Sequence, residues 1–559
     1  MIRPMQRTNK RHVTQSFCVL TIVLGVVFPR WSYAQENWSE SGEIEDAQVV
    51  VEKNREIELP NAARNFEKVP PGELQKESET QSYRFTEYDY GGSGYVPLVK
   101  ANKVSESKSQ KVHDNYVKFG FGNFISPLGQ LSLNTQQNKL NAGVHFRHLS
   151  FSRGPVDGKS SGSSDNHGGV YANLIGQKSL FSAELDFSSI KRYHYGFTDF
   201  DRSVDLSPTK QRYNQLGASI SLENSDVDDS FDYRITSGFY TLSDNFNAEE
   251  RGFNFALNLL SPEAGGFRIF SDISVLLTKY EDGTSENRNL SKLKGGIKYN
   301  LGQLTITGAA NLVLSNDTIS NANDFRLYPH AIAQYQINDD WALEGGITGD
   351  LEEVTLRTIS AENPFIDQSQ PLFHSNKQIE LYGKVRGSVS QNVGASLGIS
   401  FANYENLYFY TDSLRFDIVY DTDATDVLNL FGEMNLELSN AFNLQTRIDF
   451  FSYNTKSLGE AWHRPTLTWQ NDLQYKLNND VLLAASLSII SGIEVLNPVN
   501  SSSENLDAIV DLGLQGQYRI KDPLFVFIQL DNVLNREYER FFSYPNRSFM
   551  AHLGASYSF

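Results

Sequence analysis

The stretch GKSSG, residues 158–162, is the first place in this sequence where chemistry could be expected, because it fits the G-x-S-x-G pattern of a serine nucleophile. Ser160 would then be the attacking residue. That role needs a strand before the serine and a helix after it, whereas a Gly- and Ser-rich loop surrounds this one. The overlapping stretch 154–160 is one residue short of a phosphate-binding loop. We therefore expect no catalytic residues and no enzyme activity.

Metal binding could be expected at two places. Asp421, Asp423 and Asp426 lie close together in DTDATD, and carboxylates at such spacing can share a calcium ion. The stretch lacks the Gly and the Glu that complete an EF-hand, so a hydrated acidic turn is favoured over a calcium site. His145 and His148 do not have the spacing of a zinc site. We expect neither a metal nor a cofactor.

Charge and cysteine usage narrow the class of protein. The formal net charge is −18, whereas nucleic-acid binding needs clustered Lys and Arg, so a nucleic-acid partner is excluded. The sole cysteine, Cys18, lies in an N-terminal segment with basic residues, then an apolar run over 17–28, then small residues up to Ala34. This order is typical of a secretory signal, and the run is short for a spanning helix of about 20 residues. We predict that residues 1–34 are a signal peptide and that the exported chain contains no cysteine.

The rest of the chain divides into two parts. Residues 35–113 are acidic, are interrupted by Pro and Gly, and show no sustained period, which predicts a mostly irregular periplasmic arm. Over 114–559, segments of about ten residues alternate apolar and polar, as in FNLQTRIDF at 442–450. A period of two predicts strands whose two faces differ, and therefore an all-β fold.

The connections between these strands predict the architecture. Tight turns, such as 477–480, alternate with long polar loops, such as 191–211, so one end of the sheet would carry turns and the other loops. We expect about 22 strands if 403–426 is one excursion with its own small hairpin. A soluble sandwich or propeller would also alternate, but export and the unequal connections favour a transmembrane antiparallel β-barrel. Such a barrel would lie in lipid, in the outer membrane of a Gram-negative bacterium.

The last twelve residues, SFMAHLGASYSF, alternate up to the end of the printed chain. Large apolar residues stand at Phe549, Leu553, Tyr557 and Phe559, with small or polar residues between them. This arrangement resembles the signal that the barrel assembly machinery recognises in outer-membrane proteins. We predict that the strand closes the barrel against the first strand and that these four residues form the assembly signal.

Residues 524–559 resemble the C-terminus of TonB-dependent receptors. In that family a strand leads into an N-(L/V)-(L/F)-(N/D)-x-x-Y step, followed by a loop with Pro and Arg and then the closing strand. The matching residues here are Asn532, Val533, Leu534, Asn535, Tyr538, Pro545, Arg547 and Phe559. A barrel of about 22 strands agrees with the resemblance, because 22-stranded outer-membrane transporters form a known class.

The resemblance implies a barrel that binds or transports a solute, with TonB as a partner. Residues 44–56 loosely resemble the region of the family's energy-coupling box, with Val49, Val50 and Val51 as its extended core, although a short edge strand would look the same. The arm is too short for the globular plug that family members normally carry. A structural barrel subunit of an envelope complex, without transport activity, is therefore the alternative function.

A plug that is reduced or absent raises the question of what closes the lumen, because even barrels of 16–18 strands leave a channel. The arm, inward loops such as 351–377, or a separate plugging partner could each do so. Arg386, Arg447 and Arg519 lie on polar strand faces and could pair with the acidic arm. We expect the arm to narrow the lumen or its periplasmic mouth.

Overall fold

The computed structural model describes residues 115–137, 139–156, 161–196, 209–224, 231–316, 324–412, 415–439, 441–498 and 500–559. The predicted signal peptide, the arm with Val49, Val50 and Val51, and Ser160 lie outside the described residues. The boundaries predicted for these parts therefore remain predictions.

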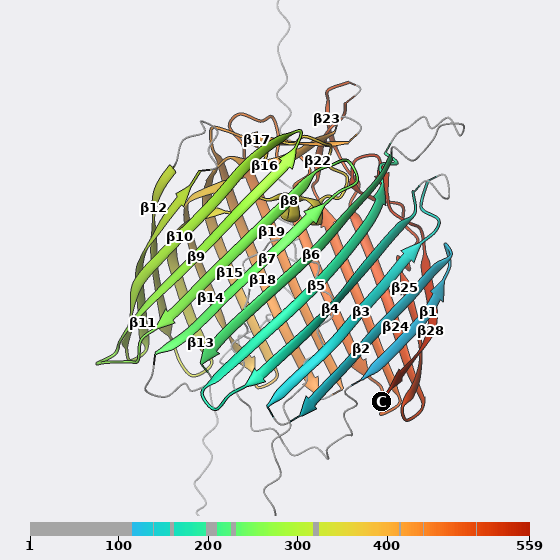
Figure 1. Ribbon diagram of the computed structural model, residues 1–559, viewed down its shortest axis with the longest axis horizontal. Coiled ribbons are helices and arrows are strands. Elements are labelled where there is room, and N and C mark those ends of the chain that lie inside the picture. The colour runs from blue at the N-terminus through green and yellow to red at the C-terminus, as the bar shows by residue number, and fades with distance from the viewer. Residues whose placement is uncertain are drawn as a thin grey trace, which may run out of the picture. The chain divides into compact units, whose positions relative to one another are not determined.

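The alternating segments form one closed antiparallel barrel of 22 strands, which confirms the predicted fold class and strand number (Figure 1). Its strands, in chain order, are β1 (Tyr116–Gly122), β2 (Ser126–Gln137), β3 (Leu140–Phe151), β4 (Ser163–Ile175), β5 (Ser179–Tyr193), β6 (Lys210–Asn224), β7 (Asp232–Ser243), β8 (Glu249–Leu260), β9 (Phe267–Asp282), β10 (Thr284–Leu301), β11 (Leu304–Ser315), β12 (Asp324–Gln336), β13 (Trp341–Glu352), β14 (Ser375–Ser390), β15 (Val393–Glu405), β18 (Thr425–Ser439), β19 (Phe442–Asn454), β20 (Leu467–Lys476), β21 (Val481–Ser491), β24 (Ile509–Lys521), β25 (Leu524–Asp531) and β28 (Met550–Ser558).

The remaining described elements lie in the connections. Three small hairpins are β16 (Leu407–Asp412) with β17 (Phe416–Asp421), β22 (Glu494–Leu496) with β23 (Ser503–Asn505), and β26 (Glu539–Phe541) with β27 (Tyr544–Pro545). Helix α2 (Leu356–Glu362) lies between β13 and β14. Among the described residues, no helix is long and apolar enough to cross a bilayer.

The two ends of the barrel differ, as the sequence predicted. Tight turns such as 477–480 lie at the end that carries the C-terminus, and β16, β17, β22 and β23 lie at the opposite, loop end (Figure 1). The excursion 403–426 does contain its own hairpin, β16–β17. The alternation is not strict, because the loop end also has tight connections after β1, β7 and β9. β9 and β10 are both long, and only one residue, Gly283, connects them. Its φ is positive, at 73°.

The last strand closes the barrel, as predicted. β28 pairs along its length with β1, and the terminal residue takes part: Phe559 N–H donates to Asn115 O at 2.9 Å, and Asn115 N–H donates back at 3.2 Å. Leu553, Tyr557 and Phe559 are exposed on the outer face. Because the backbone groups of Asn115 and Phe559 bond each other in both directions, we expect residue 559 to stay paired rather than fray.

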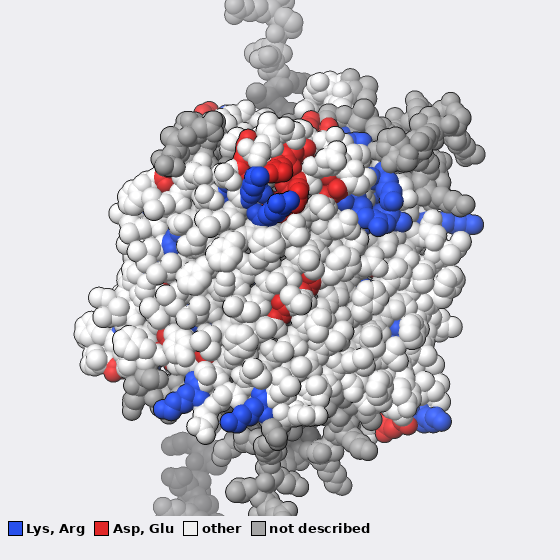
Figure 2. All heavy atoms as spheres, viewed as in Figure 1, with Lys and Arg blue, Asp and Glu red and all other residues white. Residues whose placement is uncertain are grey.

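The outer face of the barrel is apolar. Large side chains stand exposed there at alternate positions, among them Phe119, Leu185, Ile220, Ile269, Leu397 and Leu553. Charged residues gather mainly near the two ends of the wall (Figure 2). A water-soluble protein rarely exposes an apolar surface of this extent, whereas a membrane barrel needs one. With every barrel strand paired on both sides, the structure is built to cross an outer membrane.

Replacing Tyr557 and Phe559 with Ser should lower the amount of folded barrel several-fold and leave export intact, because the closing strand loses its outward aromatic residues. Folded barrel is measured in outer-membrane fractions by its heat-modifiable migration on a gel. The control replaces Tyr475 and Tyr518, outward aromatic residues of other strands, with Ser. Equal losses in both variants would mean that the terminal aromatic residues act as ordinary lipid-facing residues.

Candidate functional site

The loop end of the barrel is crossed by residues 353–374, which connect β13 to β14. Helix α2 begins after Thr355, whose hydroxyl accepts a hydrogen bond from the Thr358 N–H at 3.2 Å. In return the Thr358 hydroxyl accepts from the Thr355 N–H at 2.9 Å. This capping box satisfies N–H groups that a short helix would otherwise leave free. The segment therefore has its own secondary structure inside what the sequence predicts as a plain loop.

Glu250 of β8 holds this segment against the barrel wall at a point away from β13. β8 is five strands away from β13 in the closed sheet. The Glu250 carboxylate is fully buried and accepts hydrogen bonds from the N–H groups of Leu356 at 2.7 Å and Arg357 at 3.2 Å. It also accepts from the Tyr240 hydroxyl at 3.0 Å. A carboxylate at a helix N-terminus is favoured by the helix dipole, and charge-assisted bonds of this kind are the strong ones.

An apolar core joins the segment to the neighbouring loops. We call residues 353–374 together with the β16–β17 hairpin the mouth cover. Its members pack with inward residues of β6, β7 and β9 and with the β26–β27 hairpin; the buried residues are Tyr213, Leu242, Ala248, Tyr280, Val354, Leu356, Ile359, Phe365, Ile366, Leu372, Tyr410, Phe416, Ile418, Phe541 and Tyr544.

Backbone bonds hold the two parts of the mouth cover together. Phe416 N–H donates to Phe365 O at 3.1 Å, and Asp367 N–H donates to Phe416 O at 2.9 Å. The ring of Phe365 lies 4.1 Å from that of Tyr544, between centroids. The mouth cover is thus a packed unit with a core of its own, and burial of that core is what keeps it across the lumen.

Two histidines are buried beside this core. His194, between β5 and β6, lies near the rings of Phe246 and Phe365, with centroids 6.3 and 6.4 Å away. Burial, with a smaller contribution from the charge of Arg415, lowers the pKa of His194 to about 3. Burial likewise lowers the pKa of His463 to about 4, although its Nδ1 hydrogen-bonds to Tyr410 O at 2.8 Å. Both rings are therefore neutral at pH 7.

Below the mouth cover, the lumen wall is lined by ion pairs. Lys292 Nζ lies 2.7 Å from Asp350, Lys384 Nζ lies 3.0 Å from Glu344, and Lys294 Nζ lies 3.1 Å from Asp272, to give three examples. A polar inner face opposite an apolar outer face is the pattern of an aqueous barrel lumen.

The three arginines expected to pair with the acidic arm already form ion pairs with carboxylates of the barrel. Arg447 contacts Glu433 and Asp449, and Arg386 lies 4.0 Å from Glu344. Arg519 pairs with Asp480 and Asp522 beside the tight turns. An arm in the lumen would have to compete with these carboxylates.

No protein-family model and no curated protein matches this sequence. Solved structures do. The FrpB iron transporter from Neisseria meningitidis (F3-3 variant) is similar with a TM-score of 0.62 and 10% identity, over 80% of this chain and 82% of that chain. The pyoverdine outer membrane receptor FpvA from Pseudomonas aeruginosa PAO1 is similar with a TM-score of 0.62 and 10% identity, over 81% and 79%. The siderophore receptor PiuA from Acinetobacter baumannii gives 0.58 and 10%, over 81% and 82%.

The fold is that of the barrel of TonB-dependent receptors. At identities near 10% the likeness establishes the architecture, and it agrees with the resemblance found in residues 524–559.

The residues matched to the TonB-dependent receptor motif build the last loop of the barrel. Asn532 is fully buried with a positive φ of 48°, and its side chain bonds Arg536 and the Arg547 carbonyl. The Tyr538 hydroxyl donates to Asp511 at 2.5 Å. Leu534, in contrast, is exposed. Most of the motif residues therefore stabilise the fold of this loop.

Arg547 connects the last loop to the first long one. Its guanidinium donates to Ser161 O at 3.2 Å and to Ser163 Oγ at 2.9 Å, and it lies 4.3 Å from the ring of Phe151. Burial lowers the pKa of Arg547 to about 10. Arg547 therefore links the loop before the last strand, β28, to the loop between β3 and β4, across the place where the barrel closes.

The residues considered for metal binding do not form a site. Asp421 is buried and accepts hydrogen bonds from Thr425, Lys456 and Ser457, whereas Asp423 is exposed. His145 faces the lumen and His148 the outer side of β3, since they differ by an odd number of positions. In the described part of the chain, no group of three His, Cys, Asp or Glu residues could hold a metal ion.

Sequence reasoning missed Glu250, His194 and His463. In the sequence, Glu249 and Glu250 look like the polar end of a strand, and no local feature shows that Glu250 is fully buried while Glu249 is only partly buried. The missing information is the long-range contact with α2, 106 residues away in the chain.

Proposed function

We propose that this protein is an outer-membrane receptor that binds a solute at its loop end and transports it through the barrel, without catalysis. The observation that supports this most is the mouth cover, a packed unit that crosses a polar lumen and is anchored to the barrel wall at Glu250, five strands from β13. A barrel that served only as a membrane anchor would need no separate cover over a polar lumen. Passage would require the mouth cover to move aside.

The first class of solute to test is iron chelates, because the similar structures are described as an iron transporter and siderophore receptors. Energy for the movement would come through the arm, with TonB binding at Val49, Val50 and Val51. Barrel lipid and the assembly machinery are the other partners we propose. A separate plugging partner is not needed to explain the loop end.

A deletion strain should lose accumulation of radiolabelled iron from one or more ferric chelates, and the intact gene should restore it. Replacing Val49, Val50 and Val51 with Ser should leave the folded barrel in place and abolish uptake, since an energy-coupled step would then fail. Normal uptake of every chelate and nutrient, together with a defect in envelope assembly, would instead establish the structural barrel subunit.

A further inference from the structure

The lipid-facing side of the barrel carries positive charge in one region. Exposed apolar residues identify the outward positions of each strand, and the regular alternation then assigns the others. The outward Lys and Arg residues found in this way are Lys191, Lys210, Arg212, Arg251 and Lys279. All lie on β5, β6, β8 and β9, at the loop end. Elsewhere in the described strands, apart from residues beside β-bulges, the alternation places Lys and Arg on the lumen side.

Three of these cations form a tight group, which we call the basic triad: Lys191, Lys210 and Arg212. Lys191 and Arg212 are directly opposite each other in the β5–β6 register, and Lys210 pairs with Tyr193 one outward position further along. Like charges directly opposite each other destabilise a sheet. None of the ion pairs found among the described residues includes a member of the basic triad, whereas Arg192, on the lumen side, pairs with Asp165 at 2.5 Å.

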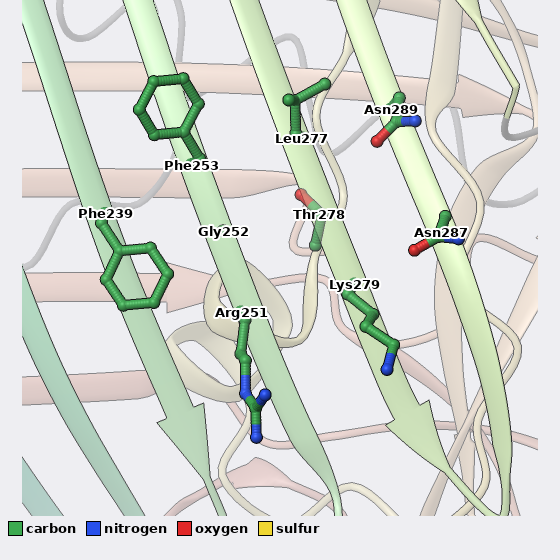
Figure 3. A pocket seen from close by; sticks show the side chains of 9 residues that line it. All are labelled: Phe239, Arg251, Gly252, Phe253, Leu277, Thr278, Lys279, Asn287 and Asn289. Carbon is green, nitrogen blue, oxygen red and sulfur yellow. The ribbon is translucent and has the colours of Figure 1, made fainter.

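The second group lies on β8 and β9. Arg251 and Lys279 are register partners on neighbouring strands, and they line one shallow pocket together with Phe239 and Phe253 (Figure 3). Arg251 pairs with Glu249 at 2.5 Å, and Lys279 pairs with Glu281, so these two cations, unlike the basic triad, already have carboxylate partners in the described part of the chain. Figure 2 shows basic residues near the loop end of this same face, with acidic residues beside part of them.

An apolar depression lies next to the cations, towards the middle of the wall. It is shallow and open to the surroundings, with a volume of about 580 Å³, and is lined by residues of β4 to β8, where small residues such as Ala172, Ala183 and Ala218 stand between larger ones such as Leu185 and Phe239. Phe239 and Phe253 line both this depression and the smaller one beside Arg251. The surface therefore places cations at the membrane interface and a hollow for acyl chains beneath them.

We propose that the β5–β9 face binds a phosphorylated glycolipid of the outer leaflet, with a phosphate group on the basic triad and its acyl chains in the depression. A phosphate on the basic triad would neutralise the repulsion between Lys191 and Arg212 and would satisfy cations that have no carboxylate partner among the described residues. Lys and Arg near the membrane interface cost little and become favourable once an anion is present. This inference does not depend on which solute the barrel transports.

The test measures binding of bis-phosphorylated lipid A, and of the same lipid with its phosphates removed, to the delipidated full chain in detergent by native mass spectrometry. We expect the phosphorylated lipid to bind at least about tenfold more tightly, since charge-assisted contacts are the strong ones. Replacing Lys191, Lys210 and Arg212 with Ser should remove that preference. Inorganic phosphate alone should compete only weakly, because it does not fill the depression.

The matched control replaces Lys292, Lys294 and Lys298, three lysines on the lumen face of β10, with Ser, so that the same number of positive charges is lost. This variant should bind lipid A as the unaltered chain does. A second variant, with Lys191 and Lys210 replaced by Arg, keeps the charge and should keep the preference, which guards against a folding defect. Equal binding of the two lipids by the unaltered chain, or an equal loss in the control, would overturn the proposal.

Discussion

Replacing residues 354–373 with a short Gly-Ser linker will turn the barrel into an open channel. The mouth cover loses the segment that crosses the lumen, and the hydrogen bonds from Leu356 and Arg357 to Glu250 disappear. A barrel of 22 strands without a filling is wide, since 16–18 strands already leave an aqueous channel. We therefore expect single-channel conductance in planar bilayers to rise by at least about tenfold.

Two further variants locate the barrier. Glu250→Ala keeps the loop length and removes only the anchor, so it should give frequent transient openings without a permanent channel. Shortening the tip of the β22–β23 hairpin at 497–502 is the control, because that tip lies outside the cluster that holds the mouth cover. It should leave conductance unchanged.

The arm provides the competing explanation of a closed lumen. Deletion of 35–110 should raise conductance if the arm also narrows the barrel, and its effect should then combine with that of the loop replacement. A barrel that stays closed after the loop replacement but opens when the arm is removed would mean that the arm, and not the mouth cover, is the barrier.

The sequence predicts the barrel well because its signal is local. Two-residue alternation is visible within a single strand, and the tight turns at 337–340, 438–441, 477–480 and 521–523 lie where the structure has them. The closing strand is visible for the same reason: Tyr557 and Phe559 alternate with serines, whatever lies beside them. The short excursion hairpin β16–β17 is likewise marked by its own alternation.

The mouth cover could not be predicted in the same way. Its order comes from contacts between segments far apart in the chain, such as Glu250 with α2 and Ile366 with Phe416. The helix itself has seven residues, too few to be stable alone, and is present because Thr355 caps it and Ile359 is buried. The outward Lys and Arg residues could not be recognised from the sequence either, because only the strand pairing shows that Lys191 and Arg212 lie opposite each other.

Acidification should open the mouth cover. His194 and His463 are buried with pKa values of about 3 and about 4, below the ordinary value of 6.5. A histidine whose pKa is lowered in the closed state binds protons more readily in the open state, so its contribution to closure is complete above pH 6.5 and declines as the pH falls towards 4. At pH 4.5, each histidine would lower the free energy of opening by about 2–3 kcal/mol relative to neutral pH, if opening fully hydrates its ring.

The measurement is single-channel open probability between pH 7.5 and pH 4.5, which should increase by at least about tenfold over that range. The neighbouring Asp244 acts in the opposite direction, because burial raises its pKa and its protonation therefore favours the closed state as the pH falls. His194→Phe fits between Phe246 and Phe365 and should remove a large part of the pH response, whereas His145→Phe, on the lumen face of β3, should not. An unchanged pH response in the His194 variant would show that its protonation does not control the mouth cover. Asp244→Asn removes the opposing group and should leave the acid-driven opening in place or increase it.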